Sequence, residues 1–441
     1  MAHWRASRGT WQLGLTLSLI LPCAACAIAE DGVARTDTAV AAEGTEGYRF
    51  PREPGTTPGG YPLPLAGIPI TKTPVVAKTA GASLKEYPEH YVPGEESLAE
   101  NEMRITACGS YGPAPLRIGQ AASCLLVELG NGDLFIFDVG SGTVANLFAL
   151  GVHPAELDKV FITHLHLDHA GGIFALFDAM GWARNVPLHL WGSSGYTEDL
   201  GITAFAENVR KAAEWHVQSK QHVLPTGGTR IIPHPFDYRA FSPERPRQLV
   251  YDENGVKIWA FPVIHVIFGS VGYRLEWNGL SLAYTADSAP STFEAEQSKG
   301  ADVFIHEIMP SAEEFAEKNF VPIEHSRLIM MEHTTPAELG AVFDIAKPHL
   351  GVGMHFALDD ELIDPLFERW RTTYDGPVLL LQDLTTINVT PEQIVVRQTL
   401  ADLLAWPPPP SDEEVDSEVG APSEAQRPAW LTETRLHLVE P

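Results

Sequence analysis

The sequence predicts an α/β fold in which two β-sheets pack face to face and helices cover the outer faces. Short apolar runs alternate with helical stretches, and histidines and aspartates recur where the predicted strands end. The runs of strand length cover 125–129, 134–137, 160–162, 188–190, 258–261, 282–284 and 303–305. Helical patterns cover 195–214, 335–346 and 360–374.

Two local signals mark the ends of predicted elements. Thr335 is expected as a helix N-cap, with Pro336 at the first helical position and Glu338 completing a capping box. Asn278 and Gly279 predict a tight hairpin between two strands. We find no internal repeat.

The composition predicts one large domain with two tails. A chain of 441 residues that is 44% hydrophobic can bury one large core, which we assign to 102–390. Residues 30–101 are rich in Pro and Gly without a sustained period, which indicates an extended tether or wrapping arm. Residues 391–441 form a C-terminal extension that ends in an acidic, proline-rich tail, expected to be disordered or loosely attached.

The N-terminus has the layout of a secretory signal. Two arginines precede an apolar stretch at 11–21, and 27–29 (AIA) is a cleavage site, so we predict a signal peptide at 1–29 and a periplasmic or secreted protein. The apolar stretch is shorter than the ~20 residues that span a bilayer, so no transmembrane span is expected after signal removal. Lipidation at Cys23 or Cys26, giving a lipoprotein, is the second alternative.

Removal of the signal would leave only Cys108 and Cys124. An oxidising compartment would let them form a disulfide. Two buried thiols in neighbouring strands are the other interpretation, which the usual burial of cysteine favours.

The charge balance weighs against a polyanionic substrate. The formal net charge is -27, from 57 acidic and 30 basic side chains. A nucleic acid would therefore meet a repulsive field, and the sequence predicts that nucleic acid is not the main substrate.

Residues 160–172 (VFITHLHLDHAGG) place a histidine cluster at the end of a predicted strand. His164 and His166 are two apart in extended chain, so their side chains point the same way and can share one cation. Asp168 and His169 follow after the chain has begun to turn and can face a second cation. Three imidazoles and a carboxylate at this spacing are hard to explain by packing and suit zinc.

Three more candidate ligands lie at predicted strand ends, where a sheet opens to a loop. They are His265, Asp287 and His355. Six further histidines are expected to be ordinary core or surface residues: His153, His189, His216, His222, His234 and His349.

The order of these residues resembles the metallo-β-lactamase superfamily over roughly 103–389, and in particular its tRNase Z and arylsulfatase-like branch. Four local patterns carry the resemblance: 138–143 (DVGSGT), His265 followed by 272–274 (GYR), the pair His306 and Glu307, and 333–335 (HTT). The resemblance implies the metallo-β-lactamase fold, an αββα sandwich, and a hydrolase acting on ester bonds.

Ligand roles follow from the same resemblance. It implies that His164, His166 and His265 bind one metal, that Asp168, His169 and His355 bind the other, and that Asp287 bridges them. The implied cofactors are two divalent metal ions, Zn²⁺ first, with Mn²⁺ or Fe²⁺ as alternatives. Many true β-lactamases use a cysteine in the second site. No cysteine lies near Asp287, so antibiotic resistance is not expected.

The expected chemistry is attack by a hydroxide held between the two cations. The resemblance implies that His333 protonates the leaving oxygen and that Glu307 orients it, with Asp168 counted as a third catalytic residue. A purely structural hydrogen bond is the alternative role for His333. Asp138 is expected to orient a ligand histidine. Arg274 either meets an anionic substrate group or forms an ion pair in the sheet.

These observations predict an exported dinuclear-metal hydrolase of a small ester, such as an arylsulfate, a phosphodiester or a lactone. The tRNase Z branch often carries a tRNA-gripping arm between the positions of His265 and Asp287, where this chain has only the hairpin at 278–279. Residues 193–247 are predicted to form a lid or pocket wall. The expected partner is a small-molecule ester, and the family implies a homodimer. The alternatives are a tRNase Z-like nuclease or phosphodiesterase, and a non-catalytic exported metal-binding scaffold, which the complete ligand set opposes.

Overall fold

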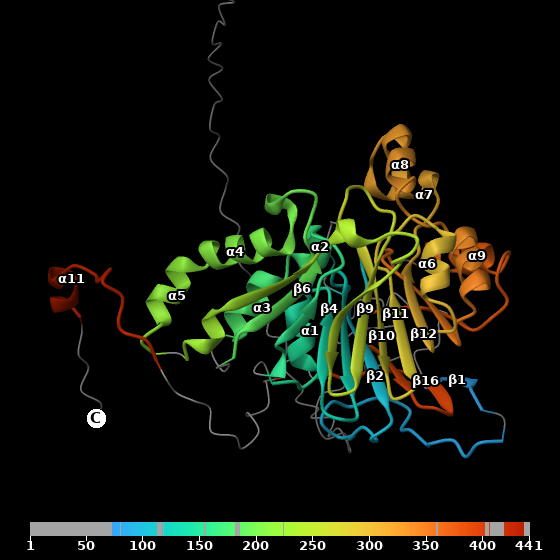
Figure 1. Ribbon diagram of the computed structural model, residues 1–441, viewed down its shortest axis with the longest axis horizontal. Helices are drawn as coiled ribbons and strands as arrows, with labels where there is room; N and C mark the ends of the chain where they lie inside the picture. The colour runs from blue at the N-terminus through green and yellow to red at the C-terminus, as the bar shows by residue number, and fades with distance from the viewer. Residues whose placement is uncertain are drawn as a thin grey trace, which may run out of the picture. The chain divides into compact units, whose positions relative to one another are not determined.

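The structure is a computed structural model, shown in Figure 1. It describes residues 73–79, 81–112, 117, 119–153, 156–180, 186–223, 225–358, 360–401, 405 and 419–435. The predicted signal peptide lies outside the described residues. No helix among the described residues is long and apolar enough to cross a membrane.

Two β-sheets form the centre of the fold. The first has nine strands in the order β1-β16-β15-β2-β3-β4-β5-β6-β7, and the second has seven in the order β14-β13-β12-β11-β10-β9-β8. The strands of the first sheet are β1 (Thr73–Ala77), β2 (Met103–Gly109), β3 (Cys124–Leu129), β4 (Leu134–Phe137), β5 (Lys159–Phe161), β6 (Leu188–Ser193), β7 (Ile231–Phe236), β15 (Thr385–Val389) and β16 (Gln393–Gln398). Those of the second are β8 (Gln248–Glu253), β9 (Val256–Pro262), β10 (Val271–Trp277), β11 (Leu280–Tyr284), β12 (Val303–Glu307), β13 (Leu350–Met354) and β14 (Val378–Leu380).

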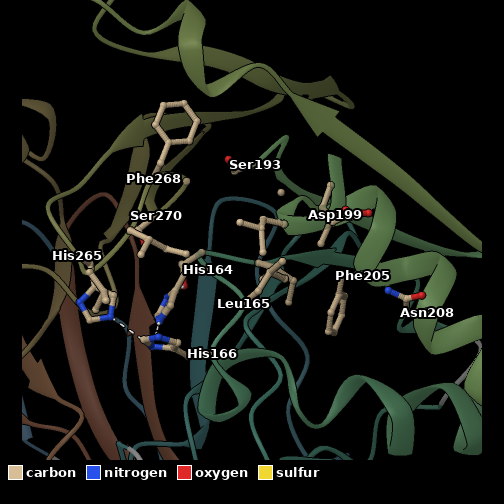
Figure 2. Close-up of a pocket in the computed structure, with 18 residues that line it drawn as sticks. His164, Leu165, His166, Ser193, Asp199, Phe205, Asn208, His265, Phe268 and Ser270 are labelled. Atoms are coloured by element: carbon tan, nitrogen blue, oxygen red, sulfur yellow. Dashed lines mark hydrogen bonds between the residues drawn. The ribbon is translucent and has the colours of Figure 1, made fainter. Parts of the chain in front are cut away.

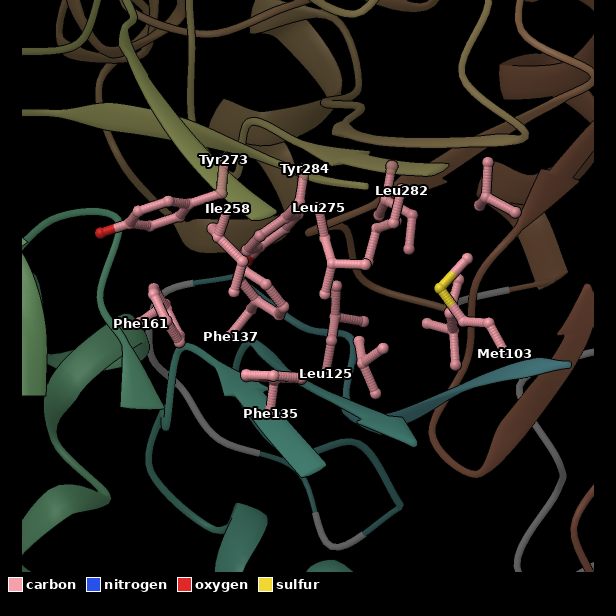
Figure 3. Packing of buried hydrophobic residues seen from close by; sticks show 14 of the residues in the cluster. Met103, Leu125, Phe135, Phe137, Phe161, Ile258, Tyr273, Leu275, Leu282 and Tyr284 are labelled. Atoms are coloured by element: carbon pink, nitrogen blue, oxygen red, sulfur yellow. The ribbon is translucent and has the colours of Figure 1, made fainter. Parts of the chain in front are cut away.

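A buried hydrophobic cluster lies between the two sheets, and Figure 3 shows part of it, with aromatic and aliphatic side chains. Phe137 of β4 stacks on Phe161 of β5 with ring centroids 5.4 Å apart, and it contacts Tyr273 of β10 at 5.7 Å. Because alternate residues of a strand point to one face, each sheet contributes every second side chain to this layer. The predicted face-to-face packing of two sheets is therefore confirmed.

Helices cover the outer faces of the sheets (Figure 1). The helices that the structure describes are α1 (Thr143–Ala149), α2 (Leu167–Ala170), α3 (Ile173–Met180), α4 (Ile202–Ala212), α5 (Glu214–Lys220), α6 (Thr292–Gln297), α7 (Ala312–Asn319), α8 (Ile323–Met330), α9 (Pro336–Ala346), α10 (Asp360–Trp370) and α11 (Ala429–Glu433). Leu147 of α1 and Leu176 of α3 belong to a second core cluster against the first sheet. Phe343 of α9 and Leu366 of α10 belong to a third against the second sheet. The αββα sandwich predicted from the sequence is confirmed.

Local signals explain several boundaries. Thr335 and Glu338 form the predicted capping box at the start of α9. Asn278 and Gly279 have φ of 50° and 80°, the positive values that a two-residue hairpin turn needs, and they join β10 to β11 as predicted.

The single helix predicted over 195–214 is wrong. A 3₁₀ turn at Glu198–Leu200 is followed by the separate helices α4 and α5. Gly201 causes the first break, because its backbone is extended (ψ 169°). A Cβ at Gly201 would lie 2.2 Å from the carbonyl oxygen of Ser194, so only glycine fits there.

The first sheet reaches past both predicted limits of the large domain. β1 lies in the predicted arm and pairs in antiparallel fashion with β16, which lies in the predicted C-terminal extension. Residues 393–398 (QIVVRQ) are rich in β-branched side chains, which favour a strand. Cys108 and Cys124 are free, buried thiols on the neighbouring strands β2 and β3.

Candidate metal centre

The histidine run begins where β5 ends. His166 is the N-cap of α2 and has an extended backbone (φ -64°, ψ 149°). His164 Nε2 lies 3.0 Å from His166 Nδ1, so the two rings converge as their spacing predicted. Asp168 and His169 lie in the single turn of α2, and their side chains converge with those of Asp287 and His355 instead. A four-residue helix therefore divides one run of sequence between two ligand groups.

The other three predicted ligands come from the second sheet. His265 follows β9, Asp287 follows β11 and His355 follows β13 directly. All three are buried, with exposed fractions of 5%, 2% and 1%. Because β9, β11 and β13 run in the same direction, their C-terminal ends lie at one edge of the sheet, and these side chains meet the histidine run there.

The structure brings all seven predicted ligands into two groups that share one residue. His164, His166, His265 and Asp287 form the first group, and Asp168, His169, His355 and Asp287 form the second. In each group the candidate ligand atoms lie within 4.8 Å of one another. We refer to them as the three-histidine group and the two-aspartate group. This division matches the set implied by the family resemblance, and the assignment of each ligand stays a prediction.

The donor set fits divalent cations. The buried Oδ1 of Asp287 has no hydrogen-bond partner among the described residues. It lies 3.1 Å from His169 Nε2 and 3.0 Å from His355 Nε2. His265 Nε2 and His166 Nδ1 also face each other at 3.4 Å. Nitrogen and carboxylate oxygen atoms that converge in this way are typical of ligands for zinc and related ions.

The electrostatics of His164 and Asp287 suit a metal. Burial, together with the neighbouring His169, holds the pKa of His164 well below its usual range, so this imidazole is neutral. Burial alone would raise the pKa of Asp287, but His355 and His169 outweigh it and hold that pKa well below the usual range. A metal requires neutral imidazoles and ionised carboxylates, and these are the forms favoured for His164 and Asp287.

Asp138 fixes the orientation of His169. Its Oδ2 accepts a hydrogen bond from His169 Nδ1 at 2.9 Å and another from the hydroxyl of Tyr284 at 2.8 Å. Its Oδ1 accepts from the backbone N–H of Thr163 at 2.8 Å. This contact directs Nε2 of His169 at the centre, which is the orienting role that the sequence predicted for Asp138. Sequence reasoning missed Thr163 and Tyr284, because a hydroxyl next to a strand end has no distinctive pattern.

Backbone strain is concentrated at the site. Four non-glycine residues there have positive φ: Asp138 (57°), Val266 (27°), Ala286 (52°) and His355 (72°). Such conformations are costly for residues with a Cβ and persist where the surroundings determine them. For His355, the backbone N–H donates to the carbonyl of Ser110 at 2.8 Å.

His333 and Glu307 form a pair beside the two-aspartate group. His333 Nδ1 donates to Glu307 Oε2 at 2.6 Å, and the backbone N–H of Ser288 donates to the other oxygen at 2.7 Å. Burial alone would lower the pKa of His333, but the Glu307 carboxylate outweighs it and raises the pKa to about 9. With Nδ1 committed to Glu307, Nε2 of His333 is the atom that carries a transferable proton.

Other candidate residues lie away from the centre. Arg274 Nε donates to Glu276 at 2.8 Å, so it forms an ion pair on the outer face of the sheet. None of the six histidines expected to be ordinary belongs to a metal-type group among the described residues.

The comparisons with known proteins agree with this geometry. Residues 117–318 match the family model described as metallo-beta-lactamase superfamily. Ribonuclease Z of Mycobacterium marinum is 26% identical over 302 residues, covering 65% of this chain and 98% of the relative. Ribonuclease Z of Thermococcus kodakarensis is 28% identical over 210 residues, covering 40% of this chain and 63% of the relative. The crystal structure of the human short form of tRNase Z is 18% identical with a TM-score of 0.48, covering 64% of this chain and 98% of that one.

These relatives overturn one expectation from the sequence. A small-molecule ester was expected as the partner and nucleic acid was not, but the relatives are ribonucleases. The expectation was wrong because net charge is a sum over the whole chain, including an acidic tail far along the sequence from the ligands. Bound divalent cations are the largest local charges in such a site and reverse the field there.

The ligand order, the shared aspartate and the matched residues together confirm the resemblance seen in the sequence and its ribonuclease Z relatives. Over residues 117–318 this chain matches the metallo-β-lactamase superfamily, and its candidate ligand set is that of a metal-dependent hydrolase.

Proposed function

We propose that the protein is a phosphodiesterase that hydrolyses RNA with two divalent cations, Zn²⁺ first among them. The observation that carries the proposal is the pair of ligand groups sharing Asp287, with His333 and Glu307 beside them. Relatives named ribonuclease Z support RNA as the substrate class.

The bound cations would supply a water of lowered pKa and offset the negative charge of the phosphate. The chain itself supplies the proton for the leaving oxygen. His333 holds it at Nε2, and Glu307 fixes the ring through Nδ1. The backbone N–H of Ser288 holds Glu307 in turn, so the position of the acid is set by β12 and by the loop after β11.

A substrate panel on purified, zinc-loaded protein tests the proposal. It contains an unprocessed tRNA, a single-stranded oligoribonucleotide, bis(4-nitrophenyl) phosphate, 4-nitrophenyl sulfate and a lactone. We expect turnover of the phosphodiesters and no comparable turnover of the sulfate or lactone. Turnover of the sulfate or lactone alone would overturn the proposal, as would a metal content below one ion per chain with no turnover.

We also propose that the chain is exported. The motivation is the N-terminal sequence, with its apolar stretch at 11–21 and the AIA site at 27–29. Sequencing the N-terminus of the protein isolated from its native cells tests this. A mature chain that starts at Glu30 supports export, and a chain that starts at Met1 contradicts it.

A further inference from the structure

A cavity of about 300 Å³ opens directly beside the three-histidine group, as Figure 2 shows. His164, His166 and His265 line one side of it. The opposite side is formed by α4 and the 3₁₀ turn before it, which belong to the segment predicted as a pocket wall. A group attached to a phosphate at the metal centre would therefore reach this cavity first.

The cavity has aromatic and aliphatic walls. Phe205 projects from α4, and Phe268 lies in the loop that follows His265, so rings from two different elements line it (Figure 2). Leu200 and Ile202 add aliphatic surface near Phe205. Walls of this kind favour a flat, partly apolar group over a strongly hydrated one.

Two exposed polar side chains lie at the same wall. Asp199 lies in the 3₁₀ turn and Asn208 lies on α4, and both line the cavity. Neither has a hydrogen-bond or ion-pair partner within the part of the chain that the structure describes. A carboxylate accepts hydrogen bonds, while an amide both donates and accepts. Together they match a ring whose edge carries donors and acceptors.

A cation lies next to Phe268, one of the residues that line the cavity. The Arg239 guanidinium carbon is 5.1 Å from the ring centroid of Phe268 and 5.5 Å from that of Tyr196. Arg239 Nη2 also donates to the carbonyl of Tyr196 at 2.6 Å, which holds the side chain in place. A guanidinium fixed against aromatic rings can meet a phosphate of a neighbouring nucleotide.

We propose that this cavity binds the base of the nucleotide whose phosphate lies at the metal centre. The inference rests on the proposed phosphodiesterase function and adds a base-binding subsite to it. The base stacks against Phe205, and Asp199 and Asn208 on the same wall meet its edge. Unstacked bases in RNA are recognised by this combination of aromatic faces and polar edge contacts.

Binding measurements on the zinc-loaded protein test the proposal without any catalytic step. Adenosine 5′-monophosphate and ribose 5-phosphate carry the same phosphate, so the difference between their dissociation constants isolates the base. We expect the nucleotide to bind about 10-fold more tightly, since stacking of one base contributes about this much. Phenyl phosphate has the flat ring but no polar edge, and we expect it to bind less tightly than the nucleotide.

Variants locate the effect in the cavity. Phe205→Leu keeps apolar volume but removes the aromatic face, and Asn208→Ala removes the edge contact. Each should reduce the preference for the nucleotide to about threefold or less. Glu207→Ala is the matched control, because Glu207 precedes Asn208 on the same helix, is exposed and does not line the cavity.

The outcomes separate this proposal from the proposed function. Equal binding of nucleotide and sugar phosphate overturns the base subsite, and so does a preference that the Phe205 and Asn208 variants retain. Phenyl phosphate binding as tightly as the nucleotide shows an aryl pocket and also overturns it. If phosphodiesters are cleaved in any of these cases, the proposed function stands alone. If no phosphodiester is cleaved but the nucleotide preference maps to the cavity, only the proposed function fails.

Discussion

The two ligand groups share Asp287 but differ in the side chains that surround them. The three-histidine group has no carboxylate of its own, and it faces the cavity next to Phe268. The two-aspartate group contains Asp168, and Asp138 and Glu307 lie within contact of its histidines. The three-histidine group therefore lies beside a cavity that can hold part of a substrate. The two-aspartate group lies beside carboxylates and the proton donor His333.

This difference suggests that the two ligand groups, which lie at one edge of the sandwich, have different roles. Negative charge around the two-aspartate group strengthens its hold on a cation and keeps His333 protonated. The three-histidine group has less negative charge around it and is more open, since His166 is exposed. Substitutions that affect both groups, one group or neither can test whether the two groups have different roles.

Asp287→Ala affects both groups and should have the largest effect. Loss of the shared carboxylate leaves each group short of a ligand, so we expect metal content to fall below one ion per chain and turnover to fall by at least about 1,000-fold. Metal analysis and steady-state kinetics measure these. Asp252→Ala, on β8 and outside the site, is the control and should change neither. A variant that keeps two ions and most of its activity would show that Asp287 is not shared.

His333→Ala affects only the side of the two-aspartate group. We expect a fall in kcat of about 100-fold for a substrate with a poor leaving group and a much smaller fall for bis(4-nitrophenyl) phosphate, whose leaving group needs no proton. Metal content should be unchanged. His325→Ala, an exposed histidine on α8, is the control. Equal slowing of both substrates would favour the structural role for His333.

Asp138→Asn should weaken the two-aspartate group more than the three-histidine group. Asp138 contacts His169 directly but reaches His164 only through the Thr163 hydroxyl, and loss of such an orienting contact weakens metal affinity by about 10- to 100-fold. Titration with a competing chelator should show the binding of one ion weakened more than that of the other. Equal weakening of both ions would mean that the two groups do not act separately.

The sequence showed which candidate ligands converge because their information is local. His164 to His169 occupy one short run, and His265, Asp287 and His355 each follow a strand. The capping box at Thr335 and the hairpin at Asn278 were predicted for the same reason. Such patterns can be recognised without knowing which distant segments of the chain are in contact in the fold.

Features that depend on packing were not predicted. The cavity combines side chains from the loop after β5, from β6, from α4 and from the loop after β9. The sequence predicted a pocket wall within 193–247, but periodicity did not show which of its side chains face the ligand histidines. The break at Gly201 depends on the carbonyl of Ser194, a contact that periodicity cannot show. The expectation about nucleic acid failed similarly, because a net charge of -27 does not say where the charges lie.

The pH dependence should reflect the proton on His333. Because Glu307 raises its pKa to about 9, the ring stays protonated below that value and loses the proton as pH rises through it. Bound cations would offset the negative charge of nearby carboxylates and so lower the pKa of His333. Activity on a substrate with a poor leaving group should therefore decline as the pH rises, with a midpoint at or below about 9. Glu307→Gln should move this decline to lower pH, and a decline that does not move would contradict the pairing.

Arg274→Gln should have the smallest effect, because Arg274 belongs to neither group. It pairs with Glu276 at 2.8 Å and donates to the carbonyl of Lys299 at 3.0 Å, on the outer face of the second sheet. We expect the free energy of unfolding to fall by about 1 kcal/mol, and kcat and KM to change less than twofold. Denaturant unfolding and kinetics on an oligoribonucleotide measure these. A selective rise in KM for the anionic substrate, with stability unchanged, would instead show that Arg274 contacts the substrate and that charge recognition extends beyond the edge where the ligands meet.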